Sequence, residues 1–358
     1  MMARTIVPFG PQHPILAEPV RYTLELEEET VVGVDFELGW MHRGIEKGAE
    51  QDYNKAIFMC ERVCGICSGV HSMTFVGCLE KAGDIPVPDR AKYLRTILLE
   101  LERIHSHLLW IGVAADAVGF QNLFMLTWRE REHVVDLMEA ITGNRVNHSY
   151  VMPGGVRGDV DEKMAKHALE VLGAVEASAK FVADQASHDR TLISRVKGVG
   201  IMDKAMCLRY GVVGPNMRGC GIKQDCRSDG YEAYKWLDFE PVTFEGGDNL
   251  SRVMVRVLET FQSIELVKKC FKQIEPGPIM EEFKGGINGE AAYRCEAPRG
   301  ELFYFIRGNG TKVLERVKIR APTLANLMVT RELLLGEEFA NIPVTILSFD
   351  PCFSCTER

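Results

Sequence analysis

Two cysteine pairs of the CxxC type stand near opposite ends of the sequence. The first is Cys64-Gly65-Ile66-Cys67, and the second is Cys352-Phe353-Ser354-Cys355, three residues before the last. Each pair offers two thiolates to one metal ion, so together they can make a four-sulfur site. Zinc ribbons place their second pair about 15–20 residues after the first. Here nearly the whole chain separates the pairs, and the fold must bring its two ends together.

The cysteine spacing leaves three kinds of chemistry open. A structural zinc ion needs no more than four thiolates, although ligands this far apart along the chain do little to nucleate a fold. A thioredoxin-like dithiol needs one pair at the start of a helix, and it gives the tail pair no role. A redox-active metal centre would use thiolates because they are soft ligands. Spacing alone does not choose among the three.

Composition narrows the class of protein. The 358 residues are 46% hydrophobic, which is ample for a packed core, and the net charge of −8 comes with no long basic run. Nucleic acid is therefore not an expected partner. We see no secretory signal and no stretch near the ~18 apolar residues of a membrane span. An odd number of cysteines, eleven, favours a reducing cytoplasm over a disulfide scaffold.

Helical periodicity dominates the segments that must position the cysteines. Apolar residues at 3–4 residue spacing predict four long helices, which cover Asp89 to about Ile111, 122–141, 160–184 and 249–274. Asp89 is the expected N-cap of the first. Helices of this length suit a bundle. The predicted fold class is mainly α with small β elements (α+β), with a central bundle of long helices.

Short β elements are predicted at both ends of the bundle. Pro and Gly make residues 1–20 an expected extended arm, and alternation over 20–37 predicts a β-hairpin. A second hairpin is predicted from strands at 302–306 and 312–319, before a short helix capped by Thr323.

We expect one domain over residues 1–358. Its three parts are the N-terminal arm and hairpin in 1–60, the helical bundle in 61–280, and the C-terminal hairpin and cysteine tail in 281–358. The Gly-rich stretch 211–221 has no Lys-Ser/Thr pair and is no phosphate-binding loop. We predict a structural turn there, at the edge of the site.

The residues around the cysteines resemble a known family. The chain resembles the large subunit of nickel–iron hydrogenases in Arg43-Gly44-Ile45-Glu46, Arg62-Val63-Cys64-Gly65-Ile66-Cys67 with His71, Glu296-Ala297-Pro298-Arg299-Gly300 and Asp350-Pro351-Cys352-Phe353-Ser354-Cys355. Two further segments resemble the compact energy-converting membrane-bound branch (the Ech and CO-induced types), namely Phe9-Gly10-Pro11-Gln12-His13-Pro14 and Glu102-Arg103-Ile104-His105-Ser106-His107. That branch is related to the 49 kDa subunit of respiratory complex I, which lacks the four cysteines.

The resemblance implies the hydrogenase large-subunit or complex I 49 kDa-like fold and a nickel–iron centre. By resemblance, Cys64, Cys67, Cys352 and Cys355 bind nickel, and Cys67 and Cys355 also bridge to an iron that carries carbonyl and cyanide ligands. Thiolates suit such soft, redox-active metals. The implied reaction is heterolytic formation or cleavage of dihydrogen.

The resemblance also implies roles for three residues around the metals. Arg299 matches an arginine held over the metals, which either polarises or deprotonates bound hydrogen or forms an ion pair that orients the site. Asp350 would orient Arg299 or cap the turn before Cys352. His71 would donate a hydrogen bond to a bridging sulfur.

A buried metal centre also needs a route for protons. Glu18 lies where the family has its relay glutamate, in the N-terminal arm before the Arg-Gly-x-Glu motif. A carboxyl group there can accept and release a proton. Cys352 is the expected thiolate that passes the proton to Glu18.

The end of the chain departs from the family pattern. Many relatives end in a histidine that binds a second, structural magnesium or iron together with the glutamate of Arg-Gly-x-Glu, here Glu46. This chain has Arg358 at that place, and arginine cannot ligate a metal. We expect Arg358 to form an ion pair with Glu46 that holds the tail, in place of a magnesium or iron ion at Glu46.

The expected partner subunits follow from the metal ligands that the sequence does and does not contain. The other seven cysteines have no motif partner at ligand spacing, so we expect no iron–sulfur cluster within the chain. Electrons would pass through a small subunit with a 4Fe–4S cluster and further iron–sulfur subunits, with ferredoxin as electron partner. Integral membrane subunits would translocate ions, and the chain would lie peripherally on the cytoplasmic side of the cell membrane.

Two rival functions come from other classes. A quinone-site subunit like that of complex I is disfavoured by the four cysteines. A structural zinc protein would have no use for the Glu-Ala-Pro-Arg-Gly and Arg-Gly-x-Glu motifs.

Overall fold

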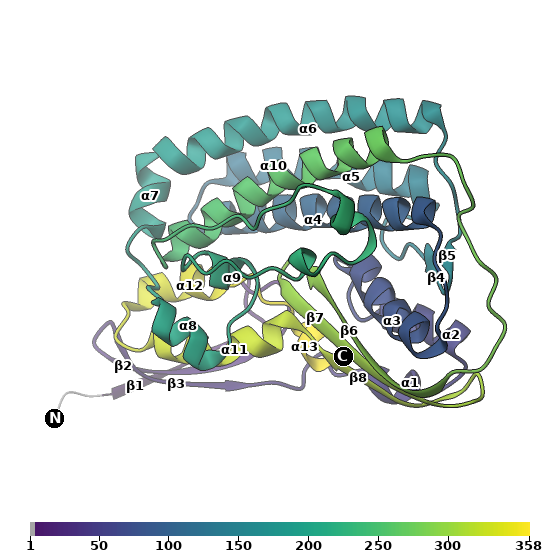
Figure 1. Ribbon diagram of the computed structural model, residues 1–358. Helices are drawn as coiled ribbons and strands as arrows, with labels where there is room; N and C mark the ends of the chain where they lie inside the picture. The colour runs from purple at the N-terminus through teal and green to yellow at the C-terminus, as the bar shows by residue number, and fades with distance from the viewer. Residues whose placement is uncertain (1–3) are drawn as a thin grey trace.

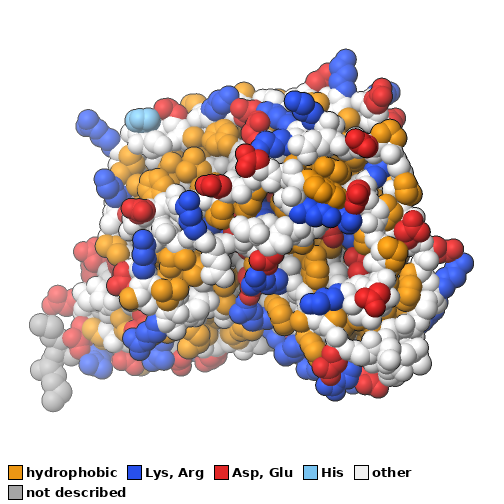
Figure 2. Space-filling model, in the orientation of Figure 1, with side chains coloured by type: hydrophobic (Ala, Val, Ile, Leu, Met, Phe, Trp, Pro, Cys, Tyr) orange, Lys and Arg blue, Asp and Glu red, His pale blue; other side chains and the backbone are white. Residues whose placement is uncertain are grey.

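A computed structural model describes residues 4–358 of the chain (Figure 1). Long helices form the upper layer in Figure 1, and two small sheets, near the N-terminus and the C-terminus, lie below them. The predicted class, mainly α with small β elements around a bundle, is confirmed. Acidic and basic side chains are interspersed over the face that Figure 2 shows. Among the described residues, no helix combines the length and apolarity needed to cross a bilayer.

Four long helices form the bundle close to their predicted bounds. They are α4 (Asp89–Ala117), α5 (Gln121–Thr142), α6 (Glu162–His188) and α10 (Asn249–Gln273). The central helix is α4, which packs against both α5 and α10. The predicted N-cap of α4 is wrong, because Pro88 holds that place and Asp89, the first helical residue, pairs with Lys92.

One buried helix was missed, and it carries the first cysteine pair at its start. This helix, α3 (Ser68–Gly83), begins directly after Cys67 and is buried from Ser68 to Leu79. A helix buried on all sides has no polar stripe, so its sequence lacks the amphipathic period that reveals surface helices. Before it lie α1 (Ile45–Gly48) and α2 (Tyr53–Glu61).

The N-terminal sheet has three antiparallel strands in the order β1-β2-β3. They are β1 (Arg4–Phe9), β2 (Arg21–Glu27) and β3 (Thr30–Glu37). The hairpin β2–β3 was predicted, but the arm expected over 1–20 was wrong for residues 4–9, while residues 1–3 lie outside the described range. Pro8 disguised the strand, and β1 tolerates this proline because it lies at the sheet edge.

The C-terminal sheet also has three strands. They are β6 (Asn288–Ala297), β7 (Gly300–Asn309) and β8 (Leu314–Arg320). The predicted hairpin corresponds to β7–β8, and β6 was missed because it begins with the weak strand formers Asn, Gly, Glu and Ala. Ala297 pairs with Gly300, so Pro298 and Arg299 alone form the turn between β6 and β7.

Short helices complete the chain and close its C-terminal end. The remaining elements are β4 (Val151–Met152), β5 (Gly155–Val156), α7 (Arg190–Val196), α8 (Lys204–Tyr210), α9 (Pro215–Arg218), α11 (Pro322–Leu334), α12 (Ile342–Ser348) and α13 (Phe353–Glu357), with short 3-10 turns between some of them. Thr323 does not cap α11 as predicted, because Ala321 holds that position. The Thr323 hydroxyl instead accepts the backbone N–H of Cys352, at 3.0 Å.

The close packing of α3 on β6 depends on a glycine, which generates a first prediction. A Cβ at Gly77 would lie 2.5 Å from the ring of Tyr293. Overpacking of this kind typically costs ~1–3 kcal/mol, so Gly77→Ala should lower the free energy of unfolding by about that amount in urea denaturation.

Gly173 of α6 is the matched control. Apart from its chain neighbours and the backbone of α6 itself, no described atom lies within 4 Å of a Cβ built there, so Gly173→Ala should raise stability by about 0.5–1 kcal/mol through helix propensity. A Gly77→Ala chain as stable as the unchanged protein would contradict the packing account.

Candidate metal centre

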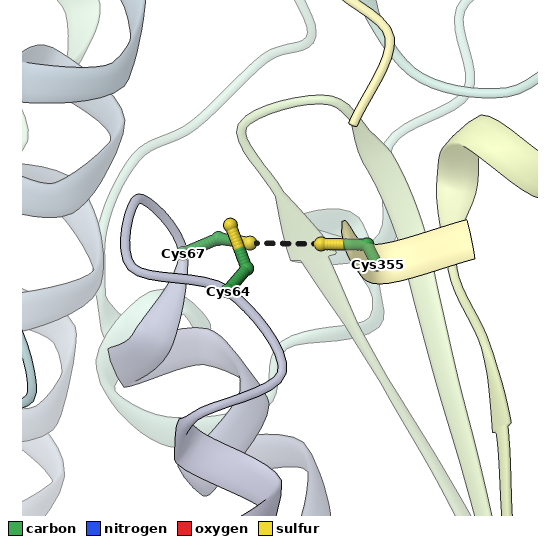
Figure 3. Close-up of side chains that lie close together, drawn as sticks. All are labelled: Cys64, Cys67 and Cys355. Atoms are coloured by element: carbon green, nitrogen blue, oxygen red, sulfur yellow. Dashed lines mark hydrogen bonds between the residues drawn. The ribbon is translucent and has the colours of Figure 1, made fainter. Parts of the chain in front are cut away.

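The four predicted cysteine ligands meet at one buried point. Cys64 and Cys67 lie on the loop between α2 and α3, and Figure 3 shows Cys355 of α13 facing them. The Sγ atom of Cys67 lies 3.4 Å from that of Cys355. The Sγ atom of Cys352 lies 3.5 Å from that of Cys64 and 3.0 Å from that of Cys355. No disulfide joins any of the described cysteines.

This cluster fits a soft metal ion. The Sγ atoms of Cys64, Cys67 and Cys355 all lie within 4.8 Å of one another, and a metal–thiolate bond is about 2.3 Å long. Hydrogen bonds from the other three thiols hold the pKa of Cys64 well below its ordinary value, whereas contact with Cys352 holds the pKa of Cys67 and Cys355 well above theirs. The bare cluster therefore keeps protons, and a bound cation would allow all four sulfurs to ionise.

One arginine that the sequence analysis left without a role joins the two cysteine segments. The guanidinium of Arg43 donates to the carbonyls of Arg62 and Val63, at 2.9 and 2.6 Å, just before the first pair. It also donates to the carbonyl of Ser354, at 3.1 Å, inside the second pair. Arg43 belongs to a recognised motif, but contacts with backbone carbonyls of distant segments leave no signal in a sequence.

His71 lies between the cluster and the C-terminal sheet. Its Nε2 is 3.4 Å from the Sγ of Cys355, and its Nδ1 is 2.7 Å from the hydroxyl of Tyr304. Burial lowers the pKa of His71 to about 4, so the ring is neutral near pH 7. With the Tyr304 hydroxyl donating to Nδ1, the Nε2–H can donate to Cys355, one of the two sulfurs expected to bridge the metals.

Arg299 projects from the two-residue turn between β6 and β7. It lines a small cavity together with Cys67, His71 and Cys355. Its Nη2 lies 2.8 Å from Oδ1 of Asp350, and its Nε donates to the Asp350 carbonyl at 2.9 Å. Of the two roles expected for Asp350, the contacts match the orientation of Arg299. Burial opposes the guanidinium charge, but Asp350 and the neighbouring thiols hold the pKa of Arg299 well above its ordinary value.

The Gly-rich stretch 211–221 lies against this turn, at the predicted edge of the site. Gly214 has a φ of 74°, a conformation that favours glycine. A Cβ at Gly214 would lie 2.4 Å from the carbonyl oxygen of Arg299. The glycine therefore lets the backbone carrying Arg299 approach closely.

Glu18 reaches the second cysteine pair through Ser354. Its carboxylate accepts the Ser354 N–H, at 2.9 Å, and also the Ser354 hydroxyl. Glu18 and Cys352 line one cavity of about 170 Å³, together with Arg299 and Asp350. The predicted donor and acceptor of the proton thus share a cavity.

The C-terminal residue forms the expected ion pair. Nε of Arg358 lies 2.9 Å from Oε1 of Glu46. Burial alone would raise the pKa of Glu46, but hydrogen bonds from the Ile319 N–H, Lys318 and Arg358 together lower it, so the carboxylate is ionised at neutral pH. Both oxygens of Glu46 thus have cationic or N–H donors.

Two families match the chain in adjoining segments. The family described as "Nickel-dependent hydrogenase" matches residues 43–115. The family described as "Respiratory-chain NADH dehydrogenase, 49 Kd subunit" matches residues 117–287 and 281–358. The segment that matches the hydrogenase family contains Cys64 and Cys67, and the segment that matches the 49 kDa family contains Cys352 and Cys355.

Whole-length relatives agree with these matches. The chain is 40% identical to "Membrane-bound hydrogenase subunit alpha" of Pyrococcus furiosus, over 98% of this chain and 87% of that protein. It is 37% identical to "Carbon monoxide-induced hydrogenase" of Rhodospirillum rubrum, over the full length of both. A chain of the "membrane-bound sulfane sulfur reductase (MBS), an archaeal respiratory membrane complex" superposes with a TM-score of 0.94 at 30% identity, over 99% of this chain and 98% of that one.

The contacts of Arg43 predict that it holds the C-terminal tail closed. Arg43→Ala removes charged donors from three backbone carbonyls, and one such bond is worth roughly 1.5–3 kcal/mol. The open state of the tail should therefore become at least about tenfold more populated. Carboxypeptidase digestion should release the last residues correspondingly faster.

Arg62→Ala is the matched control, because Arg62 is also exposed and its side chain contacts α2, through the carbonyl of Phe58 and the carboxylate of Glu61. Digestion of Arg62→Ala should match the unchanged protein. Equal digestion rates for the two variants would contradict the role of Arg43.

Proposed function

Because the chain belongs to the family that nickel-dependent hydrogenases share with the 49 kDa subunit of the respiratory-chain NADH dehydrogenase, we propose that it is the catalytic subunit of an energy-converting nickel–iron hydrogenase. One observation carries the proposal: four free cysteines from the two ends of the chain are buried with their sulfur atoms in contact. The family implies a nickel centre, and these residues fit one.

Fold alone would not support this choice, since the same fold serves other respiratory complexes. A quinone-site subunit has no need of four buried thiols in mutual contact. A structural zinc site has no need of a buried, charged arginine above the sulfurs or of a glutamate that shares a cavity with one of them. The residues around the cluster thus favour hydrogenase chemistry over both rivals.

In the proposed mechanism the protein holds the metals and manages protons. A nickel–iron centre with carbonyl and cyanide on the iron supplies, when bound, the heterolytic formation or cleavage of dihydrogen. Cys64, Cys67, Cys352 and Cys355 would hold nickel, and Cys67 and Cys355 would hold iron as well. The guanidinium of Arg299, fixed by Asp350, presents positive charge to the sulfur cluster and polarises the reactants there.

Proton transfer uses the cavity beside Cys352. The Sγ of Cys352 holds the proton at the cluster, and Glu18 lines the same cavity of about 170 Å³, which has room for water. Glu18 is only partly buried, so its carboxyl group can exchange the proton with solvent. The Ser354 N–H and hydroxyl keep the carboxylate beside the second cysteine pair.

Electrons would enter or leave beside the first cysteine pair. The side chain of Val146 lies against Gly65 of that pair and is 40% exposed. This exposed apolar side chain would contact a small subunit with a 4Fe–4S cluster. Further iron–sulfur subunits would connect ferredoxin, and membrane subunits would couple the reaction to ion translocation on the cytoplasmic side of the membrane.

Exchange of hydrogen isotopes between D₂ and water tests this function. The purified complex should catalyse the exchange, and Glu18→Gln should lower the rate by about 10²–10⁴-fold, because the amide cannot relay a proton. Nickel content should stay unchanged, since Glu18 is not a ligand.

Glu37→Gln is the control, because Glu37 is an exposed carboxylate at the end of β3. Its exchange rate should equal that of the unchanged complex. A complex with nickel but no exchange would overturn the function, and full exchange in Glu18→Gln would remove Glu18 from the proton route.

A further inference from the structure

The segment Glu102–His107 of α4 carries polar side chains into the core, although the proposed function gives it no task. Glu102, Arg103, Ser106 and His107 are each at most 1% exposed, and His105 is 4% exposed. Residues three apart on a helix share a side, so Glu102 and His105 point one way while Arg103 and Ser106 point another. Buried polar groups are normally hydrogen-bonded, and within this described segment the one side-chain atom without a partner is Nδ1 of His107.

One side of the segment holds the loop of the first cysteine pair. The Glu102 carboxylate accepts the backbone N–H groups of Gly69 and Val70, at 2.7 and 2.8 Å, in the first turn of α3 just after Cys67. Nε of Arg131 donates to Nδ1 of His105 at 3.1 Å, which leaves Nε2–H to donate to the carbonyl of Ile66, at 2.9 Å. The loop is thus attached to α4 on both sides of Cys67.

The other side of the segment holds the turn that carries Arg299. Arg103 donates through Nη2 to the carbonyl of Glu296, at 2.7 Å, and through Nη1 to that of Ala297, at 3.2 Å. These are the two residues before the Pro298-Arg299 turn. Ser106 Oγ lies 3.5 Å from Nη1 of Arg299 itself. Glu100 on α4 lies 3.4 Å from Nε of Arg103 and keeps this guanidinium in place.

We propose that Arg103 and Ser106 are positioning residues that set where Arg299 lies relative to the sulfur cluster. The first cysteine loop and the Arg299 turn are both attached within six residues of one buried helix. Their separation is therefore fixed by the geometry of α4 rather than by two independent loops. Arg103 provides the two bonds that transmit this geometry to the turn. The inference rests on the proposed function for its assay.

Arg103→Lys tests the role, because lysine keeps the charge but cannot span two carbonyls as a planar fork. Arg95→Lys is the matched control. Arg95 lies on the same helix, is equally buried, and also donates to two backbone carbonyls, those of Met152 and Gly155, as well as to Glu80. Both substitutions should cost similar stability. Three readouts apply to the purified complex: nickel per chain, isotope exchange per nickel, and the infrared bands of the centre.

Arg103→Lys should retain nickel, lose on the order of tenfold to a hundredfold of its exchange per nickel, and shift the infrared bands, because the guanidinium of Arg299 moves. Arg95→Lys should match the unchanged complex in exchange and bands. Equal exchange and unshifted bands in Arg103→Lys, or equal losses in both variants, would overturn the inference. An unchanged complex that contains nickel but shows no exchange would instead overturn the proposed function.

Ser106→Ala decides the matter if Arg103→Lys does not fold. This small change removes only the contact with Nη1 of Arg299. The expected result is a few-fold loss of exchange per nickel with shifted infrared bands. Unchanged exchange and unchanged bands would overturn the inference.

Discussion

Four buried cysteine sulfurs lie in contact, and they cannot all be thiolates in an apolar core unless a cation lies among them. Residues around the cluster supply positive charge and hydrogen-bond donors that offset this cost. Arg299 brings a positive charge to the cluster, and the buried Arg256 lies near both Asp350 and Arg299. Arg43 neutralises the carbonyl dipoles on either side of the sulfurs. Such a site is suited to hold a metal ion among its sulfurs.

The same constraint explains how the chain closes. The partners Cys67 and Cys355 are 288 residues apart, so their contact depends on everything that folds between them. The last residues are tied to the segment just after β3 by three side chains, with Arg43 bonded to Ser354, His42 to the carbonyl of Glu357, and Glu46 to Arg358. These contacts are polar and near the surface. The tail can therefore form them after the rest of the core has folded.

A feature of the fold or the site was predictable only where the residue types along the sequence carry its pattern. The bundle helices α5, α6 and α10 were foreseen because each has a polar face. Helix α4 is buried from Leu94 to Leu108, but its buried charged side chains preserve the helical pattern, whereas α3 has no charged residue between Ser68 and Leu79. The sulfur ligands were foreseen because each pair is a local motif, and the pair Glu46–Arg358 was foreseen because the family resemblance places a metal-binding histidine beside Glu46 where this chain has Arg358. The contacts of Arg43 and Arg103 are with backbone carbonyls, which have the same chemistry at every residue. Only the fold shows which carbonyls they reach.

The metal content of the purified complex tests the central claim most directly. Elemental analysis should find about one nickel per chain, with iron, and infrared spectra should show carbonyl and cyanide bands. Cys67→Ser and Cys355→Ser should each remove the nickel, because serine oxygen is a poor ligand for a soft metal. Zinc in place of nickel, with no carbonyl or cyanide bands, would contradict the account and leave a structural metal site.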